Sequence, residues 1–72
     1  MVWTQDLGTE EAWTADDGAG GVWTVLIPGN CEQGHWRIIL PNYEFVSLRF
    51  LGRRFACHFA DMLQAGRVLL GA

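Results

Sequence analysis

The chain of 72 residues contains no lysine, and its first 32 residues contain no basic residue of any kind. Residues 33–72 carry five arginines against Glu44 and Asp61, a local charge of +3. The whole chain carries −3, which argues against a domain that holds nucleic acid mainly by neutralising phosphates, because such domains have a clear positive excess. The N-terminal part carries −6, from Asp6, Glu10, Glu11, Asp16, Asp17 and Glu32.

The sequence also lacks a hydrophobic run long enough to span a bilayer, and its start shows no basic leader followed by an apolar stretch. We therefore expect a soluble cytoplasmic protein, or one in the host cytoplasm if it is viral, with no membrane partner. Cysteine is scarce as well. Cys31 and Cys57 are expected to be free thiols, since cytosolic compartments keep thiols reduced.

Apolar and aromatic residues are plentiful, at 50% and 12% of the chain. A chain with this many apolar and aromatic residues is not expected to be intrinsically disordered over its whole length. A chain this short forms a single domain, residues 1–72, and buries only about 60% of the surface that its unfolded form exposes.

The dipeptide Trp-Thr occurs three times at intervals of ten residues, with its tryptophans at Trp3, Trp13 and Trp23. This interval suits a β-meander. If each hairpin folds about its central glycine, Gly8 or Gly18, the three indoles become directly opposed on one face.

Two alternatives stay open for this acidic repeat segment, residues 1–21. A two-residue loop at Leu7-Gly8 would set Trp3 opposite Ala12 and turn Trp13 to the other face. Alternatively, the segment is a loosely ordered arm, because its strand-like runs are short and Gly-rich.

Residues 22–50 predict a three-stranded antiparallel core. The β-rich runs 22–27 and 35–40 end at turn-forming Pro-Gly-Asn and Pro-Asn sequences, and residues 43–50 should return antiparallel. Along this last run the alternation places the row Val46, Leu48 and Phe50 on the inner face.

The period changes after Gly52 and predicts an amphipathic helix over 53–66. Its apolar stripe is expected to pack on the row that contains Val46, leaving the opposite, tryptophan-bearing face exposed. The expected fold is α+β: an antiparallel meander of 3–5 strands with one C-terminal helix on one face. The residues that define the stripe are Phe55, Phe59, Met62 and Leu63.

The sequence gives little support for catalytic or metal-binding residues. Two cysteines and two histidines match the ligand count of a structural zinc, but Cys57 and His58 are adjacent on the helix and point about 100° apart. A Cys–His pair lacks an orienting acid, and an ordinary cross-strand polar pair explains Glu44 and His35 as well as an acid–base pair does. We expect no enzyme activity, no catalytic residues, no metal and no cofactor.

The acidic residues around Trp13 are candidates for partner binding: Glu10, Glu11, Asp16 and Asp17. Trp13 would anchor in a pocket of a protein partner, or the carboxylates would imitate a nucleic acid backbone. A solvated face that keeps the domain soluble explains them equally.

Four arginines are further candidates, since two lie in the first turn of the expected helix, where cations oppose the macrodipole and no side chain caps the end. They could form a basic patch for an acidic protein or for phosphate, or pair with the chain's own carboxylates. These residues are Arg37, Arg49, Arg53 and Arg54.

The leading hypothesis is a non-enzymatic protein-binding module that occupies a partner surface, in one form a phage or mobile-element inhibitor of a host nucleic-acid-targeting system such as an anti-CRISPR. One alternative is a nucleic-acid-binding module, because three strands and a helix resemble, in topology only, the arm-binding domains of some integrases. The other is a self-associating structural protein, for example a homodimer.

Overall fold

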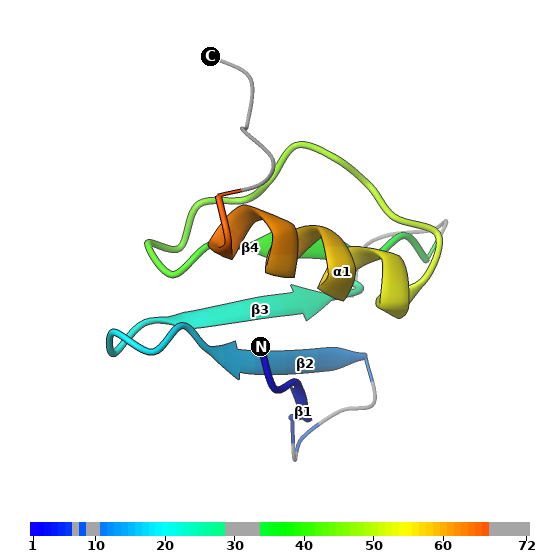
Figure 1. Cartoon of the computed structure of the whole chain (residues 1–72). Coiled ribbons are helices and arrows are strands. Elements are labelled where there is room, and N and C mark those ends of the chain that lie inside the picture. The colour runs from blue at the N-terminus through cyan, green and yellow to red at the C-terminus, as the bar shows by residue number, and fades with distance from the viewer. Residues whose placement is uncertain (7, 9–10, 29–33, 67–72) are drawn as a thin grey trace.

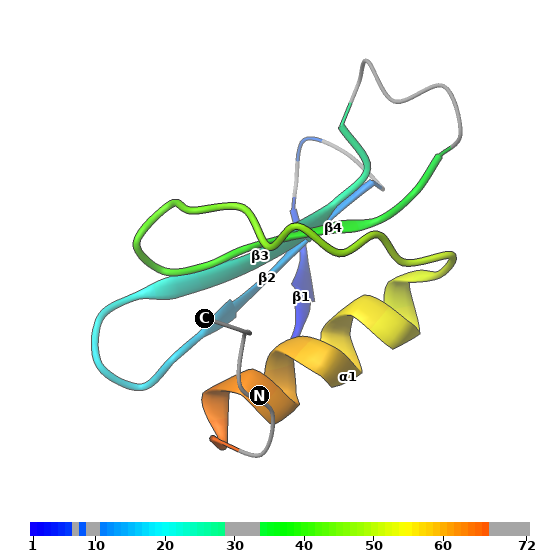
Figure 2. The ribbon, with the colours of Figure 1, turned by 90° about the horizontal axis from the view of Figure 1, so that it is seen from above.

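Four antiparallel strands form a sheet in the order β1-β2-β3-β4, and one helix covers one face of it (Figures 1 and 2). The structure is a computed structural model that describes residues 1–6, 8, 11–28 and 34–66. The expected α+β meander with a C-terminal helix is confirmed, and of the alternatives left open for the repeat segment the structure shows two strands. The elements are β1 Thr4–Gln5, β2 Ala12–Asp16, β3 Val22–Leu26, β4 Arg37–Ile39 and α1 Arg53–Gln64.

The register of the sheet explains the Trp-Thr repeat. Thr14 pairs with Thr4 on one side and with Thr24 on the other, so the three threonines form one cross-strand row. Because neighbouring residues of a strand point to opposite faces, the tryptophan before each threonine lies on the other face. The shared face of the indoles is confirmed, but their direct opposition is wrong: Trp13 pairs with Val25, and Trp23 pairs with Ala15.

The turn between β2 and β3 sets this register. The hairpin closes at the pair Asp16–Val22, so its centre is Ala19 and not Gly18. Asp17 builds the loop, because its Oδ1 accepts hydrogen bonds from the backbone N–H groups of Ala19 at 2.7 Å and Gly21 at 2.9 Å. Moving the centre by one residue shifts the pairing by two, which keeps the face of each tryptophan and changes its partner.

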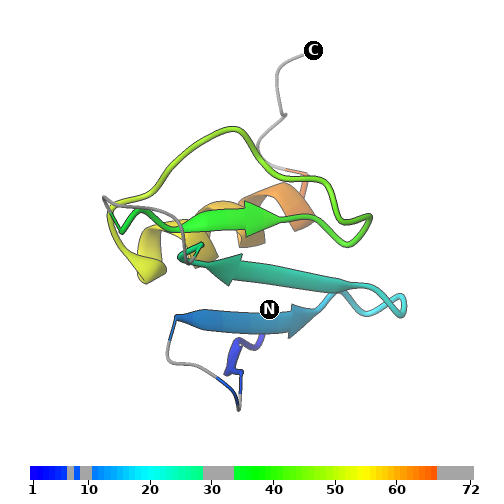
Figure 3. The same ribbon diagram turned by 180° about the vertical axis from the view of Figure 1, so that it is seen from behind.

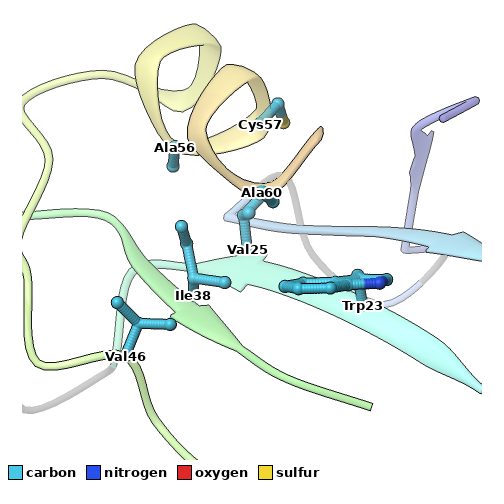
Figure 4. Packing of buried hydrophobic residues seen from close by; sticks show 7 residues of the cluster. All are labelled: Trp23, Val25, Ile38, Val46, Ala56, Cys57 and Ala60. Atoms are coloured by element: carbon cyan, nitrogen blue, oxygen red, sulfur yellow. The ribbon is translucent and has the colours of Figure 1, made fainter. Parts of the chain in front are cut away.

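The core lies between α1 and the indole face of the sheet (Figure 4). Trp23 and Val25 of β3 and Ile38 of β4 pack against the small helix residues Ala56 and Ala60. Val46 belongs to the same cluster, so α1 packs on the row that contains Val46, as expected, but this row lies on the indole face. The prediction that the indole face is left uncovered is therefore wrong. Alanine side chains let the helix approach the sheet closely, and this close contact covers the bulky residues of β3.

The stripe that packs α1 on the sheet also differs from the expected one. Ala56, Cys57 and Ala60 are buried, whereas Phe55 is 68% exposed. Phe59 is half-buried, and its ring centroid lies 5.3 Å from that of Phe50. The helix ends at Gln64, two residues before the expected end.

The expected third core strand, residues 43–50, returns antiparallel beside β4 but forms no regular strand (Figure 3). It bridges β4 and its flank at two isolated pairs, Ile39–Phe45 and Trp36–Phe50. Val46 is fully buried, as expected, but Leu48 is 47% exposed, which corrects its expected inward position. The residues between the two bridges leave the ladder, so the period-two alternation ends there.

The described residues contain one helix, α1, and it is not long and apolar enough to cross a membrane.

Candidate functional site

Large hydrophobic side chains are exposed mainly in one stretch of the chain. Among the described residues, seven such side chains are exposed, and five of them lie in residues 43–55, which we call segment 43–55. This segment runs from the turn after β4 to the first turn of α1 (Figures 1 and 2). The five are Tyr43, Phe45, Leu48, Leu51 and Phe55; the other two are Val2 and Val22.

Tyr43 opens the segment in an unfavourable backbone conformation. The turn closes by hydrogen bonds from Tyr43 N to Leu40 O and from Leu40 N to Glu44 O, both 2.9 Å. Tyr43 follows Pro41 and Asn42 at the left-handed position of this three-residue hairpin loop, with φ of 69°. A side chain with a Cβ is strained there by about 1–2 kcal/mol, and the ring is 88% exposed, so packing does not compensate the strain.

Leu51 and Phe55 close the segment at the start of α1. Gly52 is the N-cap residue in an extended conformation, and no side chain caps this end. A Cβ placed on Gly52 would lie 3.3 Å from Cδ2 of Phe55, which shows that the Phe55 ring folds back over the Gly52 backbone. Leu51 is 84% exposed beside it. The two apolar side chains therefore flank one short stretch of backbone.

Arg53 and Trp13, both expected to contact a partner, contact each other instead. The guanidinium carbon of Arg53 lies 4.1 Å from the centroid of the Trp13 ring. Such a cation–π contact is worth about 0.5–2 kcal/mol. Trp13 is half-buried. It therefore joins β2 to α1.

The structure separates Arg37 from the other candidate arginines. Arg37 pairs with Leu26 on the sheet face opposite to α1, and its Nη2 donates to Val46 O at 3.1 Å. Its guanidinium carbon lies 5.6 Å from the centroid of the Phe45 ring. Arg49 and Arg54 are exposed, on segment 43–55. The four arginines therefore do not form one patch.

The acidic candidates are also separated. Asp16 and Asp17 lie at the C-terminal end of β2 and hold the turn, the former by accepting a hydrogen bond from Gly18 N at 2.8 Å. Glu11 is exposed at the other end of β2, and Glu10 lies outside the described residues. Asp61, on α1, accepts hydrogen bonds from the Met1 amino group at 3.1 Å and from Trp3 Nε1 at 3.2 Å.

Metal-binding residues do not cluster in the described part of the chain, where no group of three or more His, Cys, Asp or Glu could hold an ion. Cys57 is a free thiol, 7% exposed in the core cluster, and Cys31 lies outside the described residues. Nδ1 of His35 is buried and makes no hydrogen bond. Glu44, its expected cross-strand neighbour, contributes backbone groups to the turn after β4.

Burial raises the pKa of the Cys57 thiol above its ordinary value of 9.0, an effect that Asp61 reinforces and Arg53 opposes. The folded chain therefore holds the thiol proton more tightly than the unfolded chain, and Cys57 contributes stability that is fully present below pH 9.0 and is lost as pH rises through the folded pKa. The test compares two proteins that both carry Cys31→Ser, one with Cys57 and one with Cys57→Ala. The difference between their free energies of unfolding should become smaller above this pH. Urea titrations across alkaline pH measure it, and a constant difference would contradict the burial of the thiol.

Sequence reasoning missed the exposed apolar side chains of segment 43–55 because it assigned Leu48 and Phe55 to the core. One signal was available: Leu51 falls between the expected strand and the expected helix and belongs to neither period.

Comparison of the chain with protein-family models, with curated proteins and with solved structures finds no match.

Proposed function

We propose that this chain is a protein-binding module that docks through segment 43–55. The observation that carries the proposal is the concentration of exposed apolar side chains there: five of the seven found among the described residues fall within thirteen consecutive positions. The segment runs from the turn after β4, at one end of the sheet, to the start of α1 at the other end, so these side chains are spread along it (Figures 1 and 2). Exposed apolar side chains that are concentrated on one part of a protein are typical of interaction surfaces, whereas single ones are normal. The indole face, by contrast, is covered by α1.

The strain at Tyr43 supports the same conclusion. An exposed tyrosine at φ of 69° loses folding free energy that glycine or asparagine would retain. Side chains kept in such conformations cluster at functional sites, and tyrosine is among the residues that most often dominate binding energy at interfaces. We assign Tyr43 to the docking surface for this reason.

Occupation of a partner surface requires no catalytic group, and it is how an inhibitor of a host nucleic-acid-targeting system would act. That form of the hypothesis stays a prediction. The nucleic-acid-binding alternative receives less support from the structure, because Arg37 and Arg53 contact opposite faces of the sheet.

Substitutions on the docking surface should separate binding from folding. Leu51→Asp and Phe55→Asp place a charge on exposed positions, so we expect a small change in melting temperature and a loss of partner retention of about tenfold or more. Retention is measured as the fraction of each protein captured from an extract of the source cells. Val2→Asp is the matched control, since Val2 and Leu51 are both 84% exposed.

Tyr43→Gly gives an independent test. Relief of the left-handed strain should stabilise the fold by up to about 1 kcal/mol, while the loss of the ring should weaken partner retention. Captured proteins that are retained equally by the parent, by Leu51→Asp and by Tyr43→Gly would show that docking occurs elsewhere on the molecule.

A further inference from the structure

We infer that the partner presents an acidic amphipathic peptide segment to segment 43–55, with carboxylates beside large apolar side chains. This inference rests on the proposed docking function and concerns the chemistry of the partner. It depends on the charges that surround the exposed apolar residues.

Along the second half of segment 43–55, residues 48–55, the charged side chains are all arginines, whereas the first half carries the exposed Glu44. Residues 45–60 contain three arginines and no acidic residue, although the chain as a whole carries −3. Arg49 lies next to Leu48 in sequence, and Arg54 lies next to Phe55; both arginines are exposed. Each exposed apolar side chain of this half thus has a guanidinium within a few positions.

The start of α1 adds to this positive character. The first turn contains no acidic side chain, and no side chain accepts from its free backbone N–H groups. The N-terminal end of a helix macrodipole is positive, so Arg54 and the helix end favour the same sign of ligand. Arg53 is held against the Trp13 ring on the side of the sheet. Among the described residues, Arg49 and Arg54 are the exposed arginines and thus the ones available to a partner.

A peptide carrying carboxylates fits this surface better than a phosphate-rich surface does. Electrostatic binding to anionic membranes generally uses about four to eight clustered basic residues, and binding to a nucleic acid backbone a clear positive excess. Here two exposed arginines, Arg49 and Arg54, stand among the exposed apolar side chains of the second half of the segment. The exposed acidic residue of the segment, Glu44, lies in the turn at its other end. Arginine combined with aromatic and aliphatic residues is typical of protein interfaces.

A second copy of the chain is a weaker candidate for the partner. Its clearest acidic feature among the described residues is the turn at Asp16 and Asp17, where carboxylate oxygens already accept hydrogen bonds from the turn backbone. Contact between that turn and segment 43–55 of a neighbour would be head-to-tail, which leads to open polymers unless the rotation closes.

Selection from a random-peptide library displayed on phage tests the chemistry directly. We expect the peptides selected by the immobilised chain to be enriched in Asp and Glu next to Trp, Phe or Leu, and to lose binding to Leu51→Asp. A synthetic peptide from this set should bind the Arg49→Gln/Arg54→Gln double variant about tenfold more weakly and lose affinity as salt rises. The Arg49→Lys/Arg54→Lys variant, which keeps the charge, should recover most of the affinity.

The outcomes separate this inference from the proposed function. Selected peptides that depend on Leu51 but are neutral or basic would overturn the acidic partner and leave docking through segment 43–55 standing. Peptides indifferent to Leu51→Asp, or an empty selection, would count against both. Leu51-dependent sedimentation with phosphatidylcholine–phosphatidylglycerol vesicles, or a Leu51-dependent dimer in analytical ultracentrifugation, would replace the peptide with a membrane or a second copy.

Discussion

Replacing Trp23 with alanine should lower the free energy of unfolding by about 3–5 kcal/mol, the range found when a buried aromatic side chain is truncated. A folded chain of this length has a total stability of only about 4–11 kcal/mol, so a large part of it is lost. The variant is expected to be largely unfolded or to melt far below the parent.

The position of Trp23 explains the size of this effect. The side chain is 5% exposed between β3 and α1, and its Nε1 donates to Oε1 of Gln64 at 2.9 Å. Gln64 in turn donates through Nε2 to Asp17 O at 3.3 Å, which ties the end of the helix to the turn between β2 and β3. Truncation at Trp23 therefore opens a cavity and also leaves Gln64 with one partner fewer.

Urea denaturation followed by far-UV circular dichroism measures the change. Trp3→Ala is the matched control, because Trp3 is only half-buried, at the edge strand, and donates to Asp61. The control should lose clearly less stability than Trp23→Ala. Equal losses would mean that the middle of the sheet does not hold the core as described.

Gly21→Ala should destabilise the fold by about 1–3 kcal/mol, an overpacking effect at a position where no cavity is available. A Cβ on Gly21 would lie 2.8 Å from Cβ of Pro41 and would also press against the Asp17 carboxylate. Neither neighbour can move easily. The proline ring is rigid, and Asp17 Oδ1 is held by hydrogen bonds from Ala19 N and Gly21 N.

This close approach joins two turns that are distant in sequence, the one between β2 and β3 and the one after β4. Gly8→Ala is the control, since its Cβ would meet only Asp6 Oδ1 at 3.9 Å, an ordinary contact. Thermal melts should show a clear drop for Gly21→Ala and little change for Gly8→Ala. The same melting temperature for both variants would contradict the contact between the turns.

The sequence predicted the elements with local signatures and missed those set by packing. The ten-residue spacing of Trp-Thr, with Gly and Asp between the copies, predicted strands whose indoles share a face, and this is confirmed. The exact pairing depended on the number of residues in the Asp17–Gly21 loop, which hydrogen bonds to the Asp17 carboxylate determine. Loop length of this kind is not visible in periodicity.

The covered face of the sheet could not be predicted because side-chain size was used as a guide to burial. Large residues such as Phe55 fitted the expected stripe, but α1 approaches the sheet through Ala56 and Ala60, which allow closer packing. Tight backbone approach favours small residues, so Phe55 remained outside while Phe59 packs at the rim of the core. The exposure of Phe55 is one reason why we propose segment 43–55 as the docking surface, whereas the sequence had pointed to Trp13.

The central claim is that the indoles belong to the fold while the free apolar surface lies on segment 43–55. Broadening of NMR signals by a soluble paramagnetic probe tests this in one experiment on the labelled chain. We predict strong broadening of the side-chain signals of Tyr43, Leu51 and Phe55, and little at Trp23. Broadening of Trp23 equal to that of Tyr43, with Leu51 and Phe55 protected, would contradict the account.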